Sequence, residues 1–177
     1  DPRPRVGDTN ANRAGFLDLV RVGRQILHST PETAYIDGAG LETRAFGRVR
    51  LQVGGYAGLP VRLYADDFFN GDVSGGAHVQ SRPWRGVRLR GDWMHVSDDY
   101  FGDRRNDLGA VSLWQALAPR DFPGAFQLHG RYTVLDGESR DVTGRLTYSN
   151  PEWDFLAQFS YFTRLDHENQ LVLEFDK

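Results

Sequence analysis

Cysteine is absent from the 177 residues, methionine occurs once, and no long apolar run is present. A chain without cysteine forms no disulfide-stapled domain and ligates no zinc or iron–sulfur cluster through thiolates. No apolar run approaches the ~20 residues of a membrane-spanning helix, so we expect no α-helical membrane protein. The formal net charge of −3 argues against a dedicated nucleic-acid-binding protein, and we expect no nucleic-acid partner.

Lysine is nearly absent as well. Lys177 is the one lysine among 21 basic residues, and the others are arginine. A GC-rich genome explains this bias most simply, because most arginine codons are GC-rich and lysine codons are AT-rich. The functional alternative is a need for planar, permanently charged guanidinium groups in a polar lumen or binding groove.

The first part of the chain differs from the rest. Residues 1–12 are polar and proline-containing, which predicts a flexible lead-in. No signal peptide is recognisable, so we expect a chain that either has none or starts at a mature or domain boundary. Apolar positions in 13–28 fit an amphipathic helix, and Pro31 predicts its end. The sequence thus predicts a lead-in and helix over 1–32, followed by a single β domain over 33–177.

From Thr33 onward the apolar residues recur with a period of two. In one such stretch, apolar Leu128 and Tyr132 alternate with polar His129 and Arg131. This alternation is typical of antiparallel strands with one apolar and one polar face. Nine strands are predicted, the last one short, at 34–46, 48–65, 73–81, 87–97, 108–118, 125–135, 141–149, 154–165 and 171–177.

The connections between these strands are of two alternating kinds. Some are marked by proline or glycine, and those between them are acidic. In an up-and-down meander, alternate connections lie at opposite ends of the strands, so we expect the acidic connections together at one end. The proline- or glycine-marked connections are 46–47, 82–86, 119–124 and 150–152, and the acidic ones are 66–72, 98–107, 136–138 and 166–169.

An antiparallel meander of this size has three common forms: an outer-membrane barrel, a soluble closed barrel around a ligand, or an open curved sheet. Alternation alone does not decide which face points inward. The strand lengths match the roughly 9–11 residues of a tilted membrane-spanning strand. Aromatic residues near the strand ends match the interface girdles of membrane barrels, namely Trp84, Trp93, Tyr132, Tyr148, Trp153 and Tyr161.

The polar face is rich in Arg, Gln, His, Thr and Ser, which suits a hydrated lumen. Its arginines predict either an anion-favouring pore or one locked by acidic partners. A solvent-facing sheet, or cross-strand pairs of arginine and acid, explains the same pattern without a pore. The candidate lumen residues are Arg48, Arg50, His78, Arg88, Arg90, His129, Arg131, Arg145 and Arg164.

In this architecture the stretch 34–175 resembles bacterial outer-membrane β-barrel proteins, although it carries no family-specific motif. The resemblance implies a complete or partial barrel that contacts lipid in the outer membrane of a Gram-negative bacterium. It also implies porin-like transport or a structural role in an envelope assembly, with other envelope proteins as partners. Closed bacterial barrels have an even number of strands and usually end in a strand with a terminal aromatic residue. The nine predicted strands and the ending 173–177 depart from this pattern, so we expect part of a longer barrel.

Two other functions stay open. One is a soluble periplasmic or extracellular barrel that binds an apolar small molecule, and the other is a sheet module that docks a protein partner. No nucleophile elbow and no HExxH motif occurs, so we expect neither an enzyme nor a cofactor. The acidic residues of 66–72 fit no standard calcium loop, and we expect no metal site.

Overall fold

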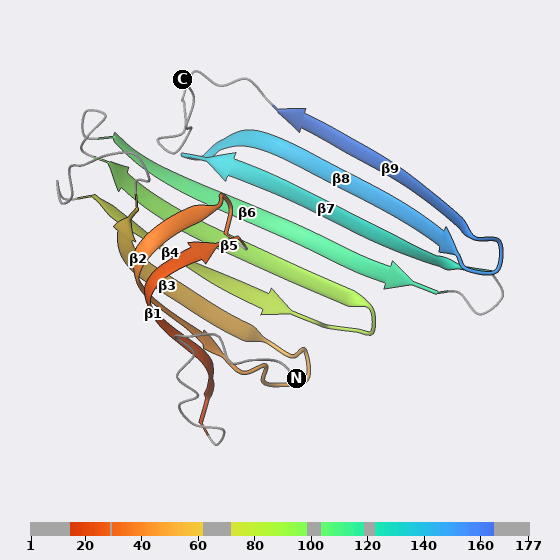
Figure 1. Cartoon of the computed structure of the whole chain (residues 1–177), viewed down its shortest axis with the longest axis horizontal. Helices are drawn as coiled ribbons and strands as arrows, with labels where there is room; N and C mark the ends of the chain where they lie inside the picture. The colour runs from red at the N-terminus through yellow and green to blue at the C-terminus, as the bar shows by residue number, and fades with distance from the viewer. Residues whose placement is uncertain (1–14, 29, 62–71, 99–103, 119–122, 165–177) are drawn as a thin grey trace.

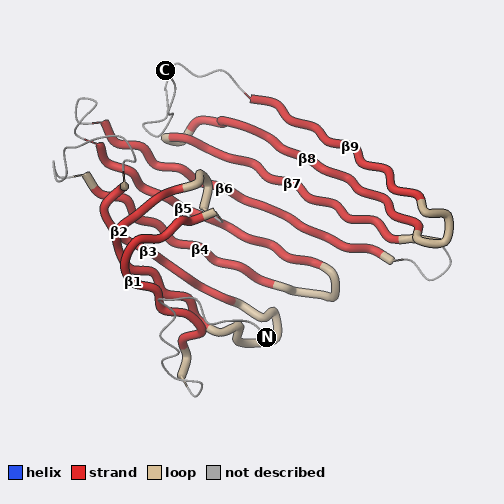
Figure 2. The backbone as a smooth tube through the Cα atoms, viewed as in Figure 1, coloured by secondary structure: helices blue, strands red, loops and turns tan. Residues whose placement is uncertain are grey.

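The computed structural model describes residues 15–28, 30–61, 72–98, 104–118 and 123–164. These residues form one sheet of nine antiparallel strands that follow one another in chain order (Figure 1). Figure 2 shows strands joined by loops and turns, with no helix among the described residues. The strands are β1 (Leu17–Leu27), β2 (Ala34–Thr43), β3 (Gln52–Pro60), β4 (Val73–Ser81), β5 (Val87–Asp98), β6 (Arg104–Leu117), β7 (Ala125–Leu135), β8 (Glu138–Asn150) and β9 (Phe155–Arg164).

The up-and-down meander predicted from the alternation is confirmed. Because every strand pairs with its chain neighbour, the connections lie alternately at two ends of the sheet. We call the end that carries the connections 44–51, 82–86, 118–124 and 151–154 the turn end, and the opposite one the loop end. The loop end includes a two-residue hairpin at Asp136 and Gly137, whose φ angles of 50° and 87° are those of a type I′ turn.

The helix predicted over 13–28 is wrong, because residues Leu17–Leu27 form the edge strand β1. This strand pairs with β2 from Leu17 opposite Thr43 to Leu27 opposite Ala34. The segment contains β-branched residues, which favour strands, and Gly23, which has a φ of 105° and would weaken a helix. Its apolar residues fit both the helical period of 3.6 and the strand period of two in part. Hydrogen bonding to β2 determines that the segment is a strand.

Most strand boundaries lie close to the prediction, with three differences. The strand predicted at 48–65 begins only at Gln52, because residues 47–50 form the turn closed by backbone bonds between Phe46 and Leu51. Strands β6 and β8 start earlier than predicted, at Arg104 and Glu138. The predicted strand 171–177 lies outside the described residues, and β1 brings the observed number to nine.

The sheet curves strongly toward one face. Ile36 of β2 lies in one buried cluster with Met94, Leu108 and Leu135, which belong to β5, β6 and β7. Strands that do not pair can share a cluster only if the sheet bends toward the face that carries it. We call this the concave face and the opposite one the convex face. In Figure 1 the ends of β1 and β2 accordingly cross in front of the central strands.

Paired glycines permit the bend between β2 and β3. Gly38 lies opposite Gly58 in the ladder. A Cβ atom on Gly38 would lie 2.2 Å from the carbonyl oxygen of Ala57, and one on Gly58 would lie 2.7 Å from that of Asp37. Only a residue without a side chain allows the two backbones to approach this closely.

The sheet does not close into a barrel. Strands β1 and β9 lie at its two edges and have one paired neighbour each among the described residues. Within the same residues, no helix is both long and apolar enough to cross a membrane. The structure is therefore an open, curved all-β meander, which agrees with the predicted fold class except for the helix and for closure.

Candidate functional site

The concave face carries the polar residues that the sequence assigns to a lumen. Ladder register links the strands on this face: His78 lies opposite Asp92, Arg88 opposite Trp114, and His129 opposite Arg145. The other predicted lumen residues of the strands are on the same face, namely Arg90, Arg131 and Arg164. Arg48 and Arg50 belong to the turn between β2 and β3.

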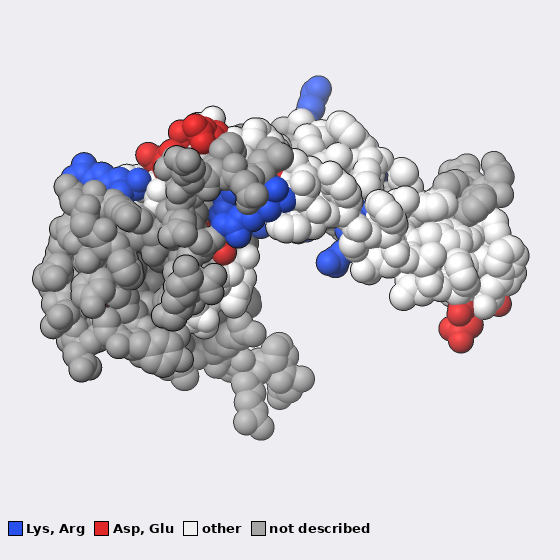
Figure 3. All heavy atoms as spheres, turned by 90° about the horizontal axis from the view of Figure 1, so that it is seen from above, with Lys and Arg blue, Asp and Glu red and all other residues white. Residues whose placement is uncertain are grey.

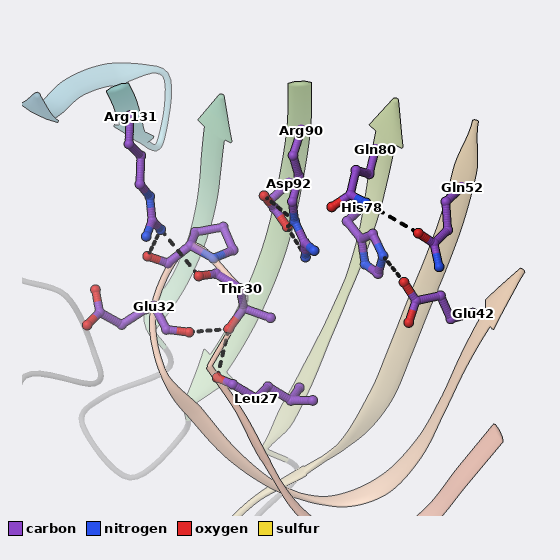
Figure 4. A network of polar contacts seen from close by, with 11 residues as sticks. Leu27, Thr30, Glu32, Glu42, Gln52, His78, Gln80, Arg90, Asp92 and Arg131 are labelled. Atoms are coloured by element: carbon purple, nitrogen blue, oxygen red, sulfur yellow. Dashed lines mark hydrogen bonds and ion pairs between the residues drawn. The ribbon is translucent and has the colours of Figure 1, made fainter. Parts of the chain in front are cut away.

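Polar side chains on this face pair between strands, and Figure 4 shows them projecting to the same side of the sheet. The ring Nε2 of His78 lies 3.4 Å from Oε1 of Glu42. Two residues further along β4, Nε2 of Gln80 donates to Oε1 of Gln52 at 3.3 Å. The face is thus a hydrogen-bonded polar surface. These two contacts pair histidine with glutamate and glutamine with glutamine, and not arginine with acid as the sequence suggested.

The strongest contact on this face joins Arg90 and Asp92 within β5. The Arg90 guanidinium donates to both carboxylate oxygens of Asp92 at 2.7–3.0 Å, and Asp92 is 8% exposed as a side chain. Charge-assisted bonds of this kind are stronger than bonds between neutral groups. Asp92 therefore depends on Arg90 for compensation of its partly buried charge.

Replacing Arg90 by glutamine is expected to lower the free energy of unfolding by about 1–3 kcal/mol, because the Asp92 carboxylate loses its charged donor. Urea titration followed by tryptophan fluorescence measures the change. Arg85→Gln is the matched control, since Arg85 is exposed and lies in a turn. Adding Asp92→Asn to Arg90→Gln should recover part of the loss. Equal unfolding midpoints for the two single variants would refute the role assigned to Arg90.

Side chains of β7 and β8 hold the turn between β1 and β2 across the concave face. Nη2 of Arg131 donates to the carbonyl oxygen of Thr30 at 3.2 Å and also to that of Pro31. Nη1 of Arg140 donates to Oε2 of Glu32 at 2.9 Å. These contacts join residues about 100 positions apart and fix the β1–β2 hairpin across the loop end of the sheet.

A double-mutant cycle on Glu32 and Arg140 should give a coupling of about 0.5–1 kcal/mol, because the Arg140 side chain is largely buried. The variants Glu32→Gln, Arg140→Gln and their combination are compared by denaturant unfolding. The exposed pair Arg24 and Asp37, at 2.8 Å, provides the comparison cycle and should couple more weakly. If the losses in unfolding free energy from Glu32→Gln and Arg140→Gln were simply additive, the contact would not hold the hairpin.

Two turns at the turn end of the sheet enclose a pocket of about 600 Å³. Three of its arginines, Arg48, Arg50 and Arg88, are among the predicted lumen residues, whereas Arg82, Arg85 and Trp114 are not. The sequence did contain a signal for Arg82 and Arg85. Alternate connections of a meander lie at one end of the sheet, and the turn 82–86 carries both of these arginines. What the sequence does not reveal is that Arg48 and Arg50 lie in the β2–β3 turn rather than in the predicted strand 48–65. This turn lies beside Arg82, whose amide donates to the carbonyl oxygen of Val49.

The convex face carries exposed apolar side chains on all nine strands, and the ion pair between Arg24 and Asp37 also lies on it, at β1 and β2. Each strand contributes at least one large exposed apolar residue to it, and Val111 in the central strand β6 is 63% exposed. The other strands contribute Val22, Leu41, Leu59, Val79, Trp93, Leu128, Leu146 and Phe159. In the right-hand part of Figure 3, uncharged atoms dominate the described surface.

The predicted interface aromatics lie at different positions along the strands. Trp84 and Trp153 are exposed in connections at the turn end, and Tyr148 lies near that end beside Phe126, with ring centroids 4.9 Å apart. Trp93 and Tyr132 are exposed in β5 and β7. Tyr161 lies opposite Gly144, in the middle of β8.

Most of the acidic connections 66–72, 98–107 and 166–169 lies outside the described residues. Within the described part of the chain, no group of three or more histidine, aspartate or glutamate residues could hold a metal ion.

The concave face thus offers hydrogen bonds and charge beside its buried apolar cluster, and the convex face offers mainly apolar contact. Comparison of the chain with protein-family models, curated proteins and solved structures finds no match.

Proposed function

We propose that this chain forms part of the wall of an outer-membrane β-barrel in a Gram-negative bacterium. The convex face contacts lipid, and the concave face lines a hydrated lumen. The role is non-enzymatic: porin-like transport, or a structural part of an envelope assembly together with other envelope proteins. The open edges of β1 and β9 are where further strands complete the barrel.

The observation that carries this proposal is the exposure of apolar side chains from all nine strands on the convex face. A surface of this extent marks contact with a membrane or another protein. Small residues also shape it: Gly91 and Gly109 open a groove of about 480 Å³ beside Trp93 and Val111. The groove is lined mostly by apolar side chains, which suits a lipid acyl chain.

The polar part of the concave face supports the same orientation, and the buried apolar cluster of Ile36, Met94, Leu108 and Leu135 occupies the loop end of that face. Membrane barrels are apolar outside and polar inside, and soluble ligand-binding barrels reverse this order. Here the charged pair Arg90–Asp92 and the pair His78–Glu42 lie on the inner side of the curve. A soluble barrel around an apolar molecule would need the opposite arrangement.

The second candidate is a sheet that docks a protein partner, and the same exposed convex face favours it. The two candidates differ in what covers the apolar surface. A partner protein would shield from water only the part of the convex face that it contacts. Lipid would cover a band of the convex face that crosses every strand.

Cell fractionation followed by gel mobility with and without heating tests the proposal. We expect the full chain in the detergent-extracted outer-membrane fraction, with a band whose mobility changes on heating. A soluble monomer without heat modification would reject the barrel wall. A soluble complex with a second protein would favour the docking sheet instead.

A further inference from the structure

The pocket at the turn end is a concentrated patch of positive charge on a chain of net charge −3. We call it the basic pocket. It contains five arginines, none of its lining residues is acidic, and its volume is about 600 Å³. Two tryptophans complete the wall. Its charged and aromatic lining residues are Arg48, Arg50, Arg82, Trp84, Arg85, Arg88 and Trp114.

Backbone hydrogen bonds hold the walls of the basic pocket in place. The amide of Arg82 donates to the carbonyl oxygen of Val49 at 2.8 Å, which fixes the end of β4 against the β2–β3 turn. The amide of Ala116 donates to the carbonyl oxygen of Gly86 at 2.7 Å, which fixes the next turn against β6. The arginines therefore project from turns whose backbones are hydrogen-bonded to neighbouring segments.

The guanidinium groups of the basic pocket are available to a ligand. Within the described residues, the side chains of Arg48, Arg50, Arg82 and Arg85 form no ion pair, and all four are exposed. Arg88 lies over the ring of Trp114, with its guanidinium carbon 5.8 Å from the ring centroid. This contrasts with Arg90, two residues further along β5, which is paired with Asp92.

We propose that the basic pocket binds a soluble ligand that carries several phosphate or carboxylate groups. A guanidinium group presents paired donors that match these oxyanions, and arginine is preferred over lysine at such sites. Five neighbouring guanidinium groups favour a multivalent ligand, because one small anion cannot contact them all. Ladder register places Arg88 and Trp114 on the concave face, away from the apolar face proposed to contact lipid.

Titration calorimetry of the folded full chain with tripolyphosphate tests this inference. We expect binding that weakens with salt and exceeds that of orthophosphate. The variant Arg82→Gln/Arg85→Gln should lose about tenfold or more in affinity through lost charge-assisted bonds. The control Arg21→Gln/Arg105→Gln removes the same charge from exposed positions outside the pocket and should change affinity by less than about twofold.

Three outcomes would overturn the inference. They are absence of tripolyphosphate binding, an equal loss in both double variants, and binding only to micelles of an anionic phospholipid. The last would assign the pocket to a lipid headgroup rather than to a soluble ligand. Circular dichroism of each variant confirms that the fold is retained. The inference does not rest on the barrel proposal, because the titration needs no membrane and succeeds or fails whatever the convex face contacts.

Discussion

Replacing Phe159 by arginine should weaken the insertion of this chain into lipid vesicles by about 2–4 kcal/mol, the cost of a cation near the bilayer midplane on the lipid-facing side of a barrel. Phe159 is 66% exposed and lies in the middle of β9 on the convex face. The arginine would have to leave water or distort the bilayer around it. Urea titration of the chain folded into phosphatidylcholine vesicles measures the difference.

The adjacent residue provides the control. Gln158 lies on the concave face opposite Thr147 and is also exposed, so Gln158→Arg adds the same charge to the same strand on the other side of the sheet. We expect Gln158→Arg to change vesicle insertion by less than about 1 kcal/mol, because a lumen position keeps its water. Equal effects of the two substitutions would mean that the convex face does not contact lipid.

Replacing Leu108 by alanine should lower the free energy of unfolding by about 2–5 kcal/mol. Leu108 is fully buried in the cluster that joins Ile36 and Ala34 of β2 to Met94, Val96 and Leu135. The substitution leaves a cavity where the bent hairpin packs on the central strands, so the loss combines reduced apolar burial with unfilled space. Denaturant unfolding in detergent measures this loss.

A control for the core lies three residues away on the same strand. Val111→Ala removes apolar volume from the exposed convex face and should cost less than about 0.5 kcal/mol in detergent. If Leu108→Ala were equally mild, the buried cluster would not stabilise the bend of the sheet. Comparison of the two substitutions shows how much the buried apolar cluster contributes to stability relative to the exposed apolar face.

Most of the sheet could be predicted because period-two alternation is a local property of the sequence. The order of the strands follows from this alternation. A connection at 136–138 is predicted, but the two-residue turn at Asp136–Gly137 is not, because the next strand is expected to begin only at residue 141. The segment 13–28 could not be assigned in this way. Its apolar residues fit two periods, and only its pairing with β2 determines that it is a strand.

The inner face required the structure because it depends on curvature, and the basic pocket required it because it depends on where the β2–β3 turn lies. Alternation shows that two faces differ, but the contact of Ile36 with Met94 and Leu108 identifies which one is concave. The same curvature accompanies the close approach of Gly38 and Gly58, a pair distant in sequence. The pairing of β3 with β4 places the turns that carry Arg50 and Arg82 side by side in one pocket, although each turn alone resembles an ordinary solvated connection.

The barrel-wall proposal is tested most directly by the lipid exposure of alternate residues along β7. Because the chain contains no cysteine, single cysteines at 127–132 can be spin-labelled without background. In a membrane preparation, we expect labels at Leu128, Gly130 and Tyr132 to be accessible to oxygen dissolved in lipid. Labels at the intervening positions 127, 129 and 131 should be accessible to a water-soluble nickel chelate. Equal nickel accessibility at all six positions would contradict a barrel wall.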